Sequence, residues 1–511
     1  MQRDVVAFLS TPAAYGLTSG PVERIDTHIS TVWLAGDRAY KLKRAVRFDY
    51  VDFSTVALRR VACDAEMRLN RRTAPMLYLA VRAVTRQADG SLALDGPGDS
   101  IDWLIEMKRF DQETLFDRLA ERGRLDIATM GPLASAIAHL HAGARIRTDR
   151  GGRAGMAGVA DGNAREFLEH GAGVLDPALG ARLAAQTRTE LCRHAARLDA
   201  RCRAGLVREC HGDLHLRNIC LLDGVPTIFD GVEFNDDISC IDVLYDLAFL
   251  LMDLGRRGLG AHANAVLNAY LEAEGGTGNL LGLAVLPLFL AMRSTIRAKV
   301  EMLRARMAAG SRAEAVRDES RAYFALAREF LAPTAPRLVA VGGLSGTGKS
   351  ALSRAIAPWL GAFPGAVIVR SDVERKRLFG VAPEERLSAR AYAPEVSDQV
   401  YAMSRKRAMM AIFGGQAAIV DAVQAKPEER EALAALAAKL GVTFTGLWLE
   451  APAKLMRGRV AARRGDVSDA TPSVVDEQLG YDIGAQGFTV IDASRPLDEV
   501  AAECLKRVRT A

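Results

Sequence analysis

Three residues in the middle of the chain have the types and the spacing that phosphoryl transfer requires. In "HGDLHLRN" Asp213 precedes Asn218 by five positions, and Asp230 ends the short apolar run "PTIFD". The transfer needs a carboxylate that orients the acceptor hydroxyl, an amide oxygen for one Mg²⁺, and a second carboxylate that bridges the metal ions. The three side chains supply these groups.

A second phosphate motif lies much later in the chain. "GLSGTGKS", residues 343–350, fits the pattern G-x-x-x-x-G-K-S/T between a strand pattern and a helix pattern. In that context the loop N–H groups and the helix N-terminus hold phosphates, the lysine reaches the terminal phosphates, and the hydroxyl ligates Mg²⁺. The predicted nucleotide-binding residues are Gly343, Ser345, Gly346, Thr347, Gly348, Lys349 and Ser350, and Ser350 is also a predicted metal ligand.

Charged residues follow the next two predicted strands. "VRSDVERKRLFG" places Asp372, Arg375 and Lys376 at the carboxyl edge of the sheet, where ligands bind in such folds. A carboxylate there can accept a proton from an attacking hydroxyl, so Asp372 is a candidate catalytic base. Arg375 and Lys376 are candidates to hold the acceptor. Asp421 lies at the end of the strand predicted in "AAIVDA" and is suited to hold Mg²⁺ through water.

An arginine cluster near the C-terminus is typical of a mobile lid that closes over transferring phosphate. "KLMRGRVAARRGDVSDAT" contains Arg457, Arg459, Arg463 and Arg464. We expect Arg463 to contact the nucleotide and Arg464 to contact the acceptor.

The elements that must position these residues fall into two parts. Alternating apolar residues predict hairpins of an antiparallel sheet within the first hundred residues, with one helix over 56–73. From about 112 to 330 the sequence is mostly helical, except for a strand-rich patch around 206–235. The prolines of "LAPTAP", residues 331–336, mark a linker. After it strands and helices alternate, which favours a parallel sheet covered on both faces.

The segment "HGDLHLRN" resembles the catalytic loop of the aminoglycoside phosphotransferase and choline kinase-like superfamily, and "IFDGVEF" resembles its metal-binding segment. The resemblance implies that Asp213 is the catalytic base and that Asn218 and Asp230 are Mg²⁺ ligands. It also implies that His211 and His215 shape the loop.

The same resemblance assigns a nucleotide site to the small lobe. Aligning "YKLKR" with the family's strand favours Lys43 as the phosphate-contacting lysine, with Lys41 as the alternative. Glu66 in "CDAEMRLNRR" is the expected partner of that lysine. "WLIEMKRF" resembles the hinge between the lobes, so backbone groups near Glu106 and Met107 are expected to bind adenine.

No G-x-G-x-x-G loop precedes the first hairpin, where "RIDTHISTVWL" lies instead. Aminoglycoside phosphotransferase-like enzymes also lack the full glycine pattern, so this departure argues against a protein kinase more than against kinase activity. Backbone near His28 and Ser30 is expected to cover the phosphates. Asp246, on an apolar helix, is expected to support the catalytic loop.

Residues from about 336 to 511 resemble the P-loop small-molecule kinases, such as the gluconate and shikimate kinase group. The Asp-x-x-Arg element after the second strand also resembles that of polynucleotide 5′-hydroxyl kinases and zeta-toxin-like kinases. Nearly the entire chain resembles a bacterial fusion of an aminoglycoside phosphotransferase-like part with a P-loop part. The expected fold is an α+β two-lobed protein-kinase-like fold followed by an α/β P-loop NTPase fold with a parallel sheet. The expected domains are 1–332, with a small lobe of about 1–105 and a large lobe of about 110–332, and 337–511.

Composition limits the other possibilities. A chain of 511 residues is too long for one hydrophobic core, and 49% apolar residues are ample for two or three domains. A formal net charge of +5 neither requires nor excludes nucleic acid. Seven scattered cysteines without a C-x-x-C pair indicate a reducing compartment and no zinc site. The N-terminus has no signal-peptide pattern, and the apolar stretch 280–292 is too short to span a membrane, so we expect a cytoplasmic protein.

The leading hypothesis is a two-headed kinase that uses ATP and Mg²⁺, with each head transferring phosphate to a hydroxyl of a small molecule. Three alternatives stay open. In the first, the N-terminal part is a nucleotide-binding sensor or scaffold that regulates a single active C-terminal kinase. In the second, the acids of "EFNDDISCID" bind an aminoglycoside and the chain confers resistance. In the third, the C-terminal head phosphorylates nucleic acid ends; we favour a small-molecule acceptor over nucleic acid and expect no membrane partner.

Overall fold

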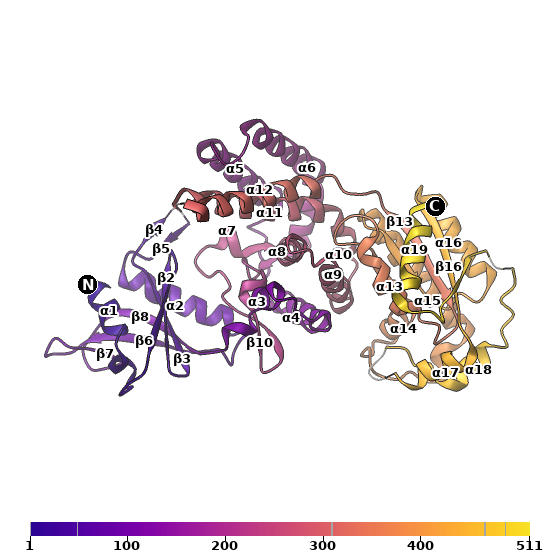
Figure 1. Ribbon diagram of the computed structural model, residues 1–511, viewed down its shortest axis with the longest axis horizontal. Helices are drawn as coiled ribbons and strands as arrows, with labels where there is room; N and C mark the ends of the chain where they lie inside the picture. Colours follow the sequence, from indigo (N-terminus) through magenta and orange to yellow (C-terminus); the bar gives the residue numbers. More distant parts are fainter. Residues whose placement is uncertain (1, 49, 308–309, 464–466, 486, 511) are drawn as a thin grey trace. The chain divides into compact units, whose positions relative to one another are not determined.

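A computed structural model describes residues 2–48, 50–307, 310–463, 467–485 and 487–510 (Figure 1). The chain divides into two compact units. The first consists of Met1–Met156 and Asp199–Asp253, and the second of Ala157–Leu198 and Leu254–Ala511. This division differs from the predicted boundary near 333–336, because the helices that follow Leu254 pack with the C-terminal part of the chain.

The first unit begins with an antiparallel sheet of six strands in the order β1-β2-β3-β8-β6-β7. The strands are β1 (Val22–Asp26), β2 (Ser30–Ala35), β3 (Arg38–Lys43), β6 (Tyr78–Arg86), β7 (Leu92–Leu94) and β8 (Asp99–Lys108), and β4 (Arg47–Phe48) pairs separately with β5 (Val51–Asp52). Alternate residues such as Trp33, Leu42 and Leu104 are buried with Val5 and Leu9 of α1 (Gln2–Leu9). The predicted antiparallel sheet is confirmed.

The helix α2 (Val56–Asn70) packs on the face of this sheet opposite to α1. Its N-cap is Thr55, whose hydroxyl accepts from the N–H of Leu58 at 3.2 Å. Cys63 and Met67 pack against Ile105, and these positions share the inner face of the helix because three or four residues make one turn. The same face carries the predicted site residue Glu66.

A second group of elements in the first unit carries the catalytic-loop motif. These are α3 (Phe116–Glu121), α4 (Met130–Gly143), β9 (Val207–Glu209), β10 (Ile219–Leu222), β11 (Val225–Ile228), α7 (Asp236–Ser239), β12 (Cys240–Asp242) and the start of α8 (Val243–Arg256). β10 and β11 form a hairpin with Ile219 opposite Ile228. The N–H of Phe229 then donates to the carbonyl of Asn218 at 3.0 Å. The hairpin therefore brings Asn218 and Asp230 to its open end.

The second unit contains a parallel sheet of five strands in the order β14-β15-β13-β16-β17. The strands are β13 (Arg337–Gly343), β14 (Val367–Arg370), β15 (Ala418–Asp421), β16 (Thr443–Glu450) and β17 (Thr489–Asp492). Helices α13 (Lys349–Ile356) and α19 (Leu497–Thr510) share one core with the apolar strand residues, and α15 (Pro394–Phe413) and α16 (Pro427–Leu440) cover the other face. The predicted parallel sheet is confirmed, and α14 (Ser371–Phe379), α17 (Ala453–Ala461) and α18 (Pro472–Gln478) complete this fold.

Helices from the middle of the chain pack in the same unit. They are α5 (Gly152–His170), α6 (Pro177–Arg203), α9 (Gly260–Glu274), α10 (Gly278–Gly282), α11 (Leu286–Met307) and α12 (Gly310–Phe330). One stretch, Gly278–Arg306, is long and apolar enough to cross a membrane, but 78% of its most apolar window is buried inside the protein. The apolar stretch 280–292 of the sequence analysis lies within this buried part.

Candidate functional sites

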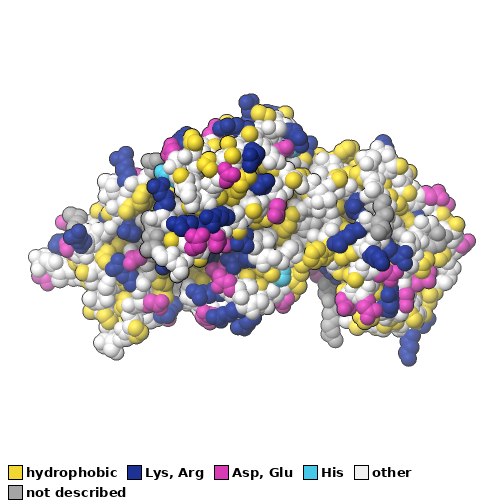
Figure 2. Space-filling view, turned by 45° about the horizontal axis from the view of Figure 1, so that its top comes forward, with side chains coloured by type: hydrophobic (Ala, Val, Ile, Leu, Met, Phe, Trp, Pro, Cys, Tyr) yellow, Lys and Arg dark blue, Asp and Glu magenta, His cyan; other side chains and the backbone are white. Residues whose placement is uncertain are grey.

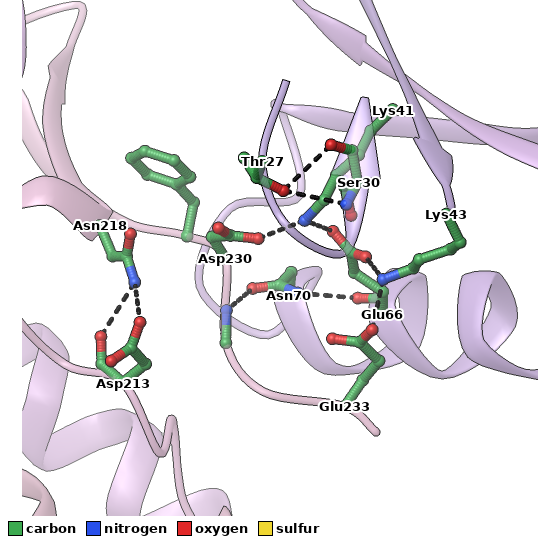
Figure 3. A network of polar contacts seen from close by, with 12 residues as sticks. Thr27, Ser30, Lys41, Lys43, Glu66, Asn70, Asp213, Asn218, Asp230 and Glu233 are labelled. Carbon is green, nitrogen blue, oxygen red and sulfur yellow. Dashed lines mark hydrogen bonds and ion pairs between the residues drawn. The ribbon is translucent and has the colours of Figure 1, made fainter. Parts of the chain in front are cut away.

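The first site is built around Lys41 on β3 (Figure 3). The ammonium of Lys41 lies 2.8 Å from Oε1 of Glu66 and 2.5 Å from Oδ1 of Asp230. Burial alone would lower the pKa of Lys41, but the carboxylates of Asp230 and Glu66 outweigh it and raise that pKa well above its ordinary value. Lys41 is therefore a fixed cation next to a predicted metal ligand.

Lys43 lies deeper in the same network. Its ammonium bonds both Oε2 of Glu66 and Oε1 of Glu233, and its side chain is only 1% exposed. Lys41 and Lys43 share the face of β3 that meets α2, but the second lysine is enclosed between two carboxylates. The geometry therefore favours the alternative, Lys41, as the phosphate-contacting lysine.

Hydrogen bonds of Asn70 also connect α2 with the segment that carries Asp230. The N–H of Gly231 donates to Oδ1 of Asn70 at 2.7 Å, and Nδ2 of Asn70 donates to the carbonyl of Glu66 at 3.0 Å. Neither Asn70 nor Glu233 was predicted as a site residue. Their signal in the sequence was weak, because a lone polar residue on a helix or in a loop is usually solvated.

The catalytic loop places Asp213 beside Asn218, as the spacing predicted. Nδ2 of Asn218 donates to the carbonyl of Asp213 at 2.9 Å and to its Oδ2 at 3.1 Å. Nε2 of His215 lies 3.3 Å from the same carboxylate oxygen. Asn218 and Asp230 therefore both lie at the open end of the hairpin, with Asp213 beside Asn218, and amide and carboxylate oxygens are donors that suit Mg²⁺.

Asp246 holds the catalytic loop by accepting hydrogen bonds from its backbone. Its two carboxylate oxygens accept the N–H groups of His211 at 3.1 Å and Gly212 at 2.9 Å, and Oδ2 also lies 3.0 Å from Nε2 of His141. Gly212 has a φ of +83°, a conformation that favours glycine. Nε2 of His211 bonds the carbonyl of Phe229 at 2.8 Å, so the loop is also tied to the metal-binding segment.

Glu106 and Met107, which are expected to bind adenine through their backbone, lie within a strand of the sheet. Both residues lie inside β8, which is paired with β3 on one side and with β6 on the other. Their backbone groups face two neighbouring strands and are not presented to a ligand. The carboxylate of Glu106 pairs with Arg38 and Arg82. The strand continues to Lys108, so the chain leaves the sheet just after the two residues.

The backbone of the turn between β1 and β2, which is expected to cover the phosphates, makes hydrogen bonds within the turn itself. The N–H of Ser30 donates to the hydroxyl of Thr27 at 2.9 Å, and the N–H of Thr27 donates to the carbonyl of Ser30 at 2.8 Å. Burial and the neighbouring Arg44 lower the pKa of His28. The turn is a closed structure in which Ser30 presents no backbone donor.

The second site is a cavity of about 720 Å³ around the P-loop. Ser350 donates its hydroxyl to Oδ2 of Asp421 at 2.6 Å, because the pairing of Val341 with Asp421 aligns the ends of β13 and β15. Lys349 donates to the carbonyl of Gly343 at 2.8 Å. Burial lowers the pKa of Lys349 and raises the pKa of Asp421. A hydroxyl next to a buried carboxylate is a donor set that suits Mg²⁺.

The glycines of the loop are required by close packing. A Cβ at Gly346 would lie 2.5 Å from the carbonyl oxygen of Met456, and the φ of Gly346 is +85°. Gly343 and Gly348 also have positive φ. The loop can therefore approach a phosphate with its backbone because no side chain intervenes.

Two residues that were predicted for the acceptor side, one as base and one as contact, line the cavity. Asp372 and Arg375 both line it. The guanidinium of Arg375 donates to the carbonyl of Ala391 at 2.5 Å and lies over the ring of Tyr392, 4.7 Å from its centroid. Arg375 is therefore held in place at the wall by the segment before α15.

Lys376, the other predicted acceptor contact on α14, is not among the residues that line the cavity. It is 3% exposed, and its ammonium bonds Oδ1 of Asp469 at 2.7 Å and the carbonyl of Glu385. Residues one apart on a helix point about 100° away from each other, and Lys376 is directed to Asp469. Arg464, the other predicted acceptor contact, lies outside the described residues.

Arginines in α17 and just after it also line the cavity. Arg463 lines it, as predicted, and so does Arg459, which donates to the carbonyl of Thr347 at 3.2 Å. Arg457 instead pairs with Asp476 at 2.6 Å. Lining residues that were not predicted include Arg354, Arg370, Tyr392, Tyr401 and Gln478. Arg370 had a usable signal, because it ends the same strand that precedes Asp372.

The comparisons with known proteins agree with this division into two sites. Residues 62–282 match the model of the phosphotransferase enzyme family, and residues 338–481 match the model of an AAA domain. The chain is a kinase-type enzyme with a phosphotransferase-family domain and a P-loop domain. It is 28% identical over 512 residues to uncharacterized proteins of Mycobacterium tuberculosis and Mycobacterium bovis, and the match covers 98% of each chain.

Solved structures resemble this phosphotransferase in parts. A choline/ethanolamine kinase family protein from Mesorhizobium loti aligns with a TM-score of 0.40 and 16% identity, covering 65% of this chain and 95% of that chain. A gluconokinase from Sinorhizobium meliloti 1021 aligns with a TM-score of 0.26 and 22% identity, covering 35% of this chain and 94% of that chain.

Proposed function

We propose that both heads are active and that each transfers the γ-phosphate of ATP to a hydroxyl of a small-molecule acceptor with the help of Mg²⁺. The observation that supports this proposal is the presence of a complete set of groups in each unit. The first set is Lys41, Glu66, Asp213, Asn218 and Asp230, and the second is Lys349, Ser350, Asp372 and Asp421.

In the first head Lys41 would hold the phosphates, and Glu66 fixes its ammonium at 2.8 Å. Asp213 would orient the acceptor hydroxyl and accept its proton. Asn218 and Asp230 would hold Mg²⁺, which neutralises charge on the phosphates when bound. Lys43 would act only by keeping Glu66 in position.

In the second head the P-loop backbone and Lys349 would bind the phosphates, and Asp372 would accept the proton of the acceptor hydroxyl. Ser350 and Asp421 would hold Mg²⁺. Arg459 and Arg463 line the nucleotide end of the cavity, where positive charge stabilises the transferring phosphate.

The surroundings favour a neutral or anionic small molecule over an aminoglycoside or nucleic acid. The acids that suggested a polycation site are neutralised by arginines: Asp236 pairs with Arg147 at 2.8 Å, and Asp242 pairs with Arg201 at 2.7 Å. On the face in Figure 2, basic and acidic side chains are interspersed, whereas a nucleic acid site needs a continuous basic patch. All seven cysteines are free thiols, which supports a cytoplasmic location.

The test uses the purified protein with Mg²⁺-ATP and a mixed bacterial metabolite extract, and mass spectrometry follows the new phosphorylated species. We compare the unaltered protein with Asp213→Ala and Lys349→Ala. If each substitution removes a different product, or Lys349→Ala leaves a singly phosphorylated intermediate, both heads are kinases. If Asp213→Ala changes nothing while Lys349→Ala removes all products, the first unit is a regulatory module and the two-headed proposal fails.

A further inference from the structure

Helix α9 of the second unit contacts β14, the edge strand of the P-loop sheet. β14 is the edge strand in the order β14-β15-β13-β16-β17, and β15 pairs with only one of its sides. The outer side of an edge strand presents backbone N–H and C=O groups that need partners. Side chains of α9 supply such partners for β14.

The side chains of two asparagines of α9 make hydrogen bonds with the outer edge of β14, where a further strand could otherwise pair. Oδ1 of Asn268 accepts from the N–H of Ile368 at 2.7 Å, and its Nδ2 donates to the carbonyl of Ala366 at 3.1 Å. Asn264, which is 2% exposed, donates to the same carbonyl at 3.1 Å. Residues two apart on a strand present their backbone groups to the same edge, so the carboxamide of Asn268 pairs with β14 as a peptide group would.

The C-terminal end of α9 holds the helices that follow β14. The carbonyl of Glu272 accepts from Arg377 of α14 at 3.3 Å, and the carbonyl of Gly275 accepts from Arg407 of α15 at 3.2 Å. Both arginines also pair with Glu374 on α14, Arg407 at 3.1 Å. The last carbonyls of a helix carry partial negative charge, so arginines are favourable there.

Asp372 lies between these two attachments. β14 ends at Arg370, and α14 begins at Ser371 with Asp372 in its first turn. The backbone before β14 packs closely on its surroundings, which include α9. A Cβ at Gly365 would lie 2.3 Å from the carbonyl oxygen of Ala357 and 2.9 Å from Nδ2 of Asn264, and the φ of Gly365 is +114°. The strand and the helix that present Asp372 are therefore both held by α9.

We propose that α9 is a positioning element of the P-loop head and that Asn268 is a positioning residue for Asp372 in the acceptor site. The inference rests on the proposed function of this head. Helix α9 lies within residues 62–282, which match the phosphotransferase enzyme family, but in this proposal it serves the P-loop head. Because the P-loop follows β13, which is separated from β14 by β15, α9 should control the acceptor side and leave nucleotide binding unchanged.

Hydrogen exchange of the full chain, followed by mass spectrometry, tests the contact. Asn268→Leu removes both hydrogen bonds, Asn268→Asp keeps the acceptor for the N–H of Ile368, and Ala261→Leu on the exposed start of α9 is the control. We expect peptides over 366–374 to exchange about tenfold faster in Asn268→Leu, the factor expected for one lost buried hydrogen bond. Asn268→Asp should show a smaller increase and the control none. Unchanged exchange in Asn268→Leu would refute the proposal.

Turnover tests the consequence. We measure ATP consumption with the metabolite extract as the difference between each protein and the same protein carrying Lys349→Ala. Asn268→Leu should lower this difference about tenfold, with partial recovery in Asn268→Asp, while the affinity for a fluorescent ATP analogue with Mg²⁺ stays within about twofold. Faster exchange with undiminished turnover would show that α9 does not position the site.

If the unaltered protein shows no turnover that depends on Lys349, the proposed function of the P-loop head fails. The inference is then judged by exchange alone. The amides of 371–374, which include Asp372, must become faster in Asn268→Leu, and their constancy would overturn the role of α9.

Discussion

Lys41 and Lys43 point to the same face of β3, but only Lys41 contacts the predicted metal ligand Asp230. We expect Lys41→Met to lower the turnover of the first head by about 100-fold, because a fixed cation next to the transferring phosphate is lost. Lys43→Met removes the cation between two buried carboxylates, so Glu233 loses its lysine while Glu66 keeps Lys41. We therefore expect it to lower the free energy of unfolding by about 3–5 kcal/mol. ATP consumption with the P-loop head inactivated, and urea unfolding, measure the two effects.

The matched control is the double variant Lys43→Met, Glu233→Leu. It removes one buried carboxylate together with the cation, so part of the lost stability should return. If Lys43→Met abolished turnover in a stable protein while Lys41→Met remained active, the assignment of Lys41 would be wrong.

For single residues, the spacing in the sequence identifies groups that lie close together along the chain. It does not reveal which side of an element is buried. The spacing of Asp213 and Asn218 was sufficient to place them side by side, as was the P-loop pattern for Lys349 and Ser350. Lys376 was assigned to the acceptor because residue type alone does not reveal which side of α14 faces the cavity. The side that is buried depends on the position of Asp469, far along the sequence.

Protonation links the catalytic loop to the stability of the first unit. His211 is buried, and burial lowers its pKa below the ordinary value despite the nearby Asp246. Because the folded state favours the neutral ring, the stabilising effect is complete above the unfolded pKa of about 6.5 and is lost as the pH falls below it. We expect the free energy of unfolding to decrease below that pH, by at most about 1.4 kcal/mol per pH unit from this residue.

Urea titrations at several pH values measure this change of the free energy of unfolding with pH. Hydrogen exchange in peptides of the first unit reports the unfolding of that unit. His211→Gln keeps a donor for the carbonyl of Phe229 and should flatten the acidic slope, whereas His139→Gln on the exposed side of α4 should retain it. An acidic slope that is the same in His211→Gln as in the unaltered protein would contradict the assignment.

Elements were predicted well where a local pattern defines them. Alternation marked the antiparallel strands, and the apolar runs after the linker marked all five strands of the parallel sheet. The packing partner of an element has no such local signal. Asn264 and Asn268 interrupt the apolar pattern of α9, and nothing in their spacing reveals that they bond the edge of β14. The pairing of β8 with both β3 and β6 likewise has no local signal in the sequence.

The whole molecule combines two predicted folds but divides differently from the predicted domains. The linker at 331–336 ends the helical region, yet the helices after Leu254 pack with the P-loop fold. Composition changes mark where a chain changes secondary structure, and they do not show which elements share a core. A family boundary and a compact unit can therefore differ within one chain, and the functional domains 1–332 and 337–511 stay a prediction.

Two complete sets of phosphate-binding groups predict two nucleotide sites per chain. Equilibrium binding of a non-hydrolysable ATP analogue with Mg²⁺ should give a stoichiometry of two, because each site has its own lysine and its own metal ligands. Lys41→Met and Lys349→Ala should each leave one site, and the double variant none. Chelation of Mg²⁺ should weaken both sites, since the phosphates then face Asp230 or Asp421 without a neutralising cation. A stoichiometry of one that Lys41→Met does not change would mean that the first unit binds no nucleotide, and the two-headed enzyme would be refuted before any acceptor is known.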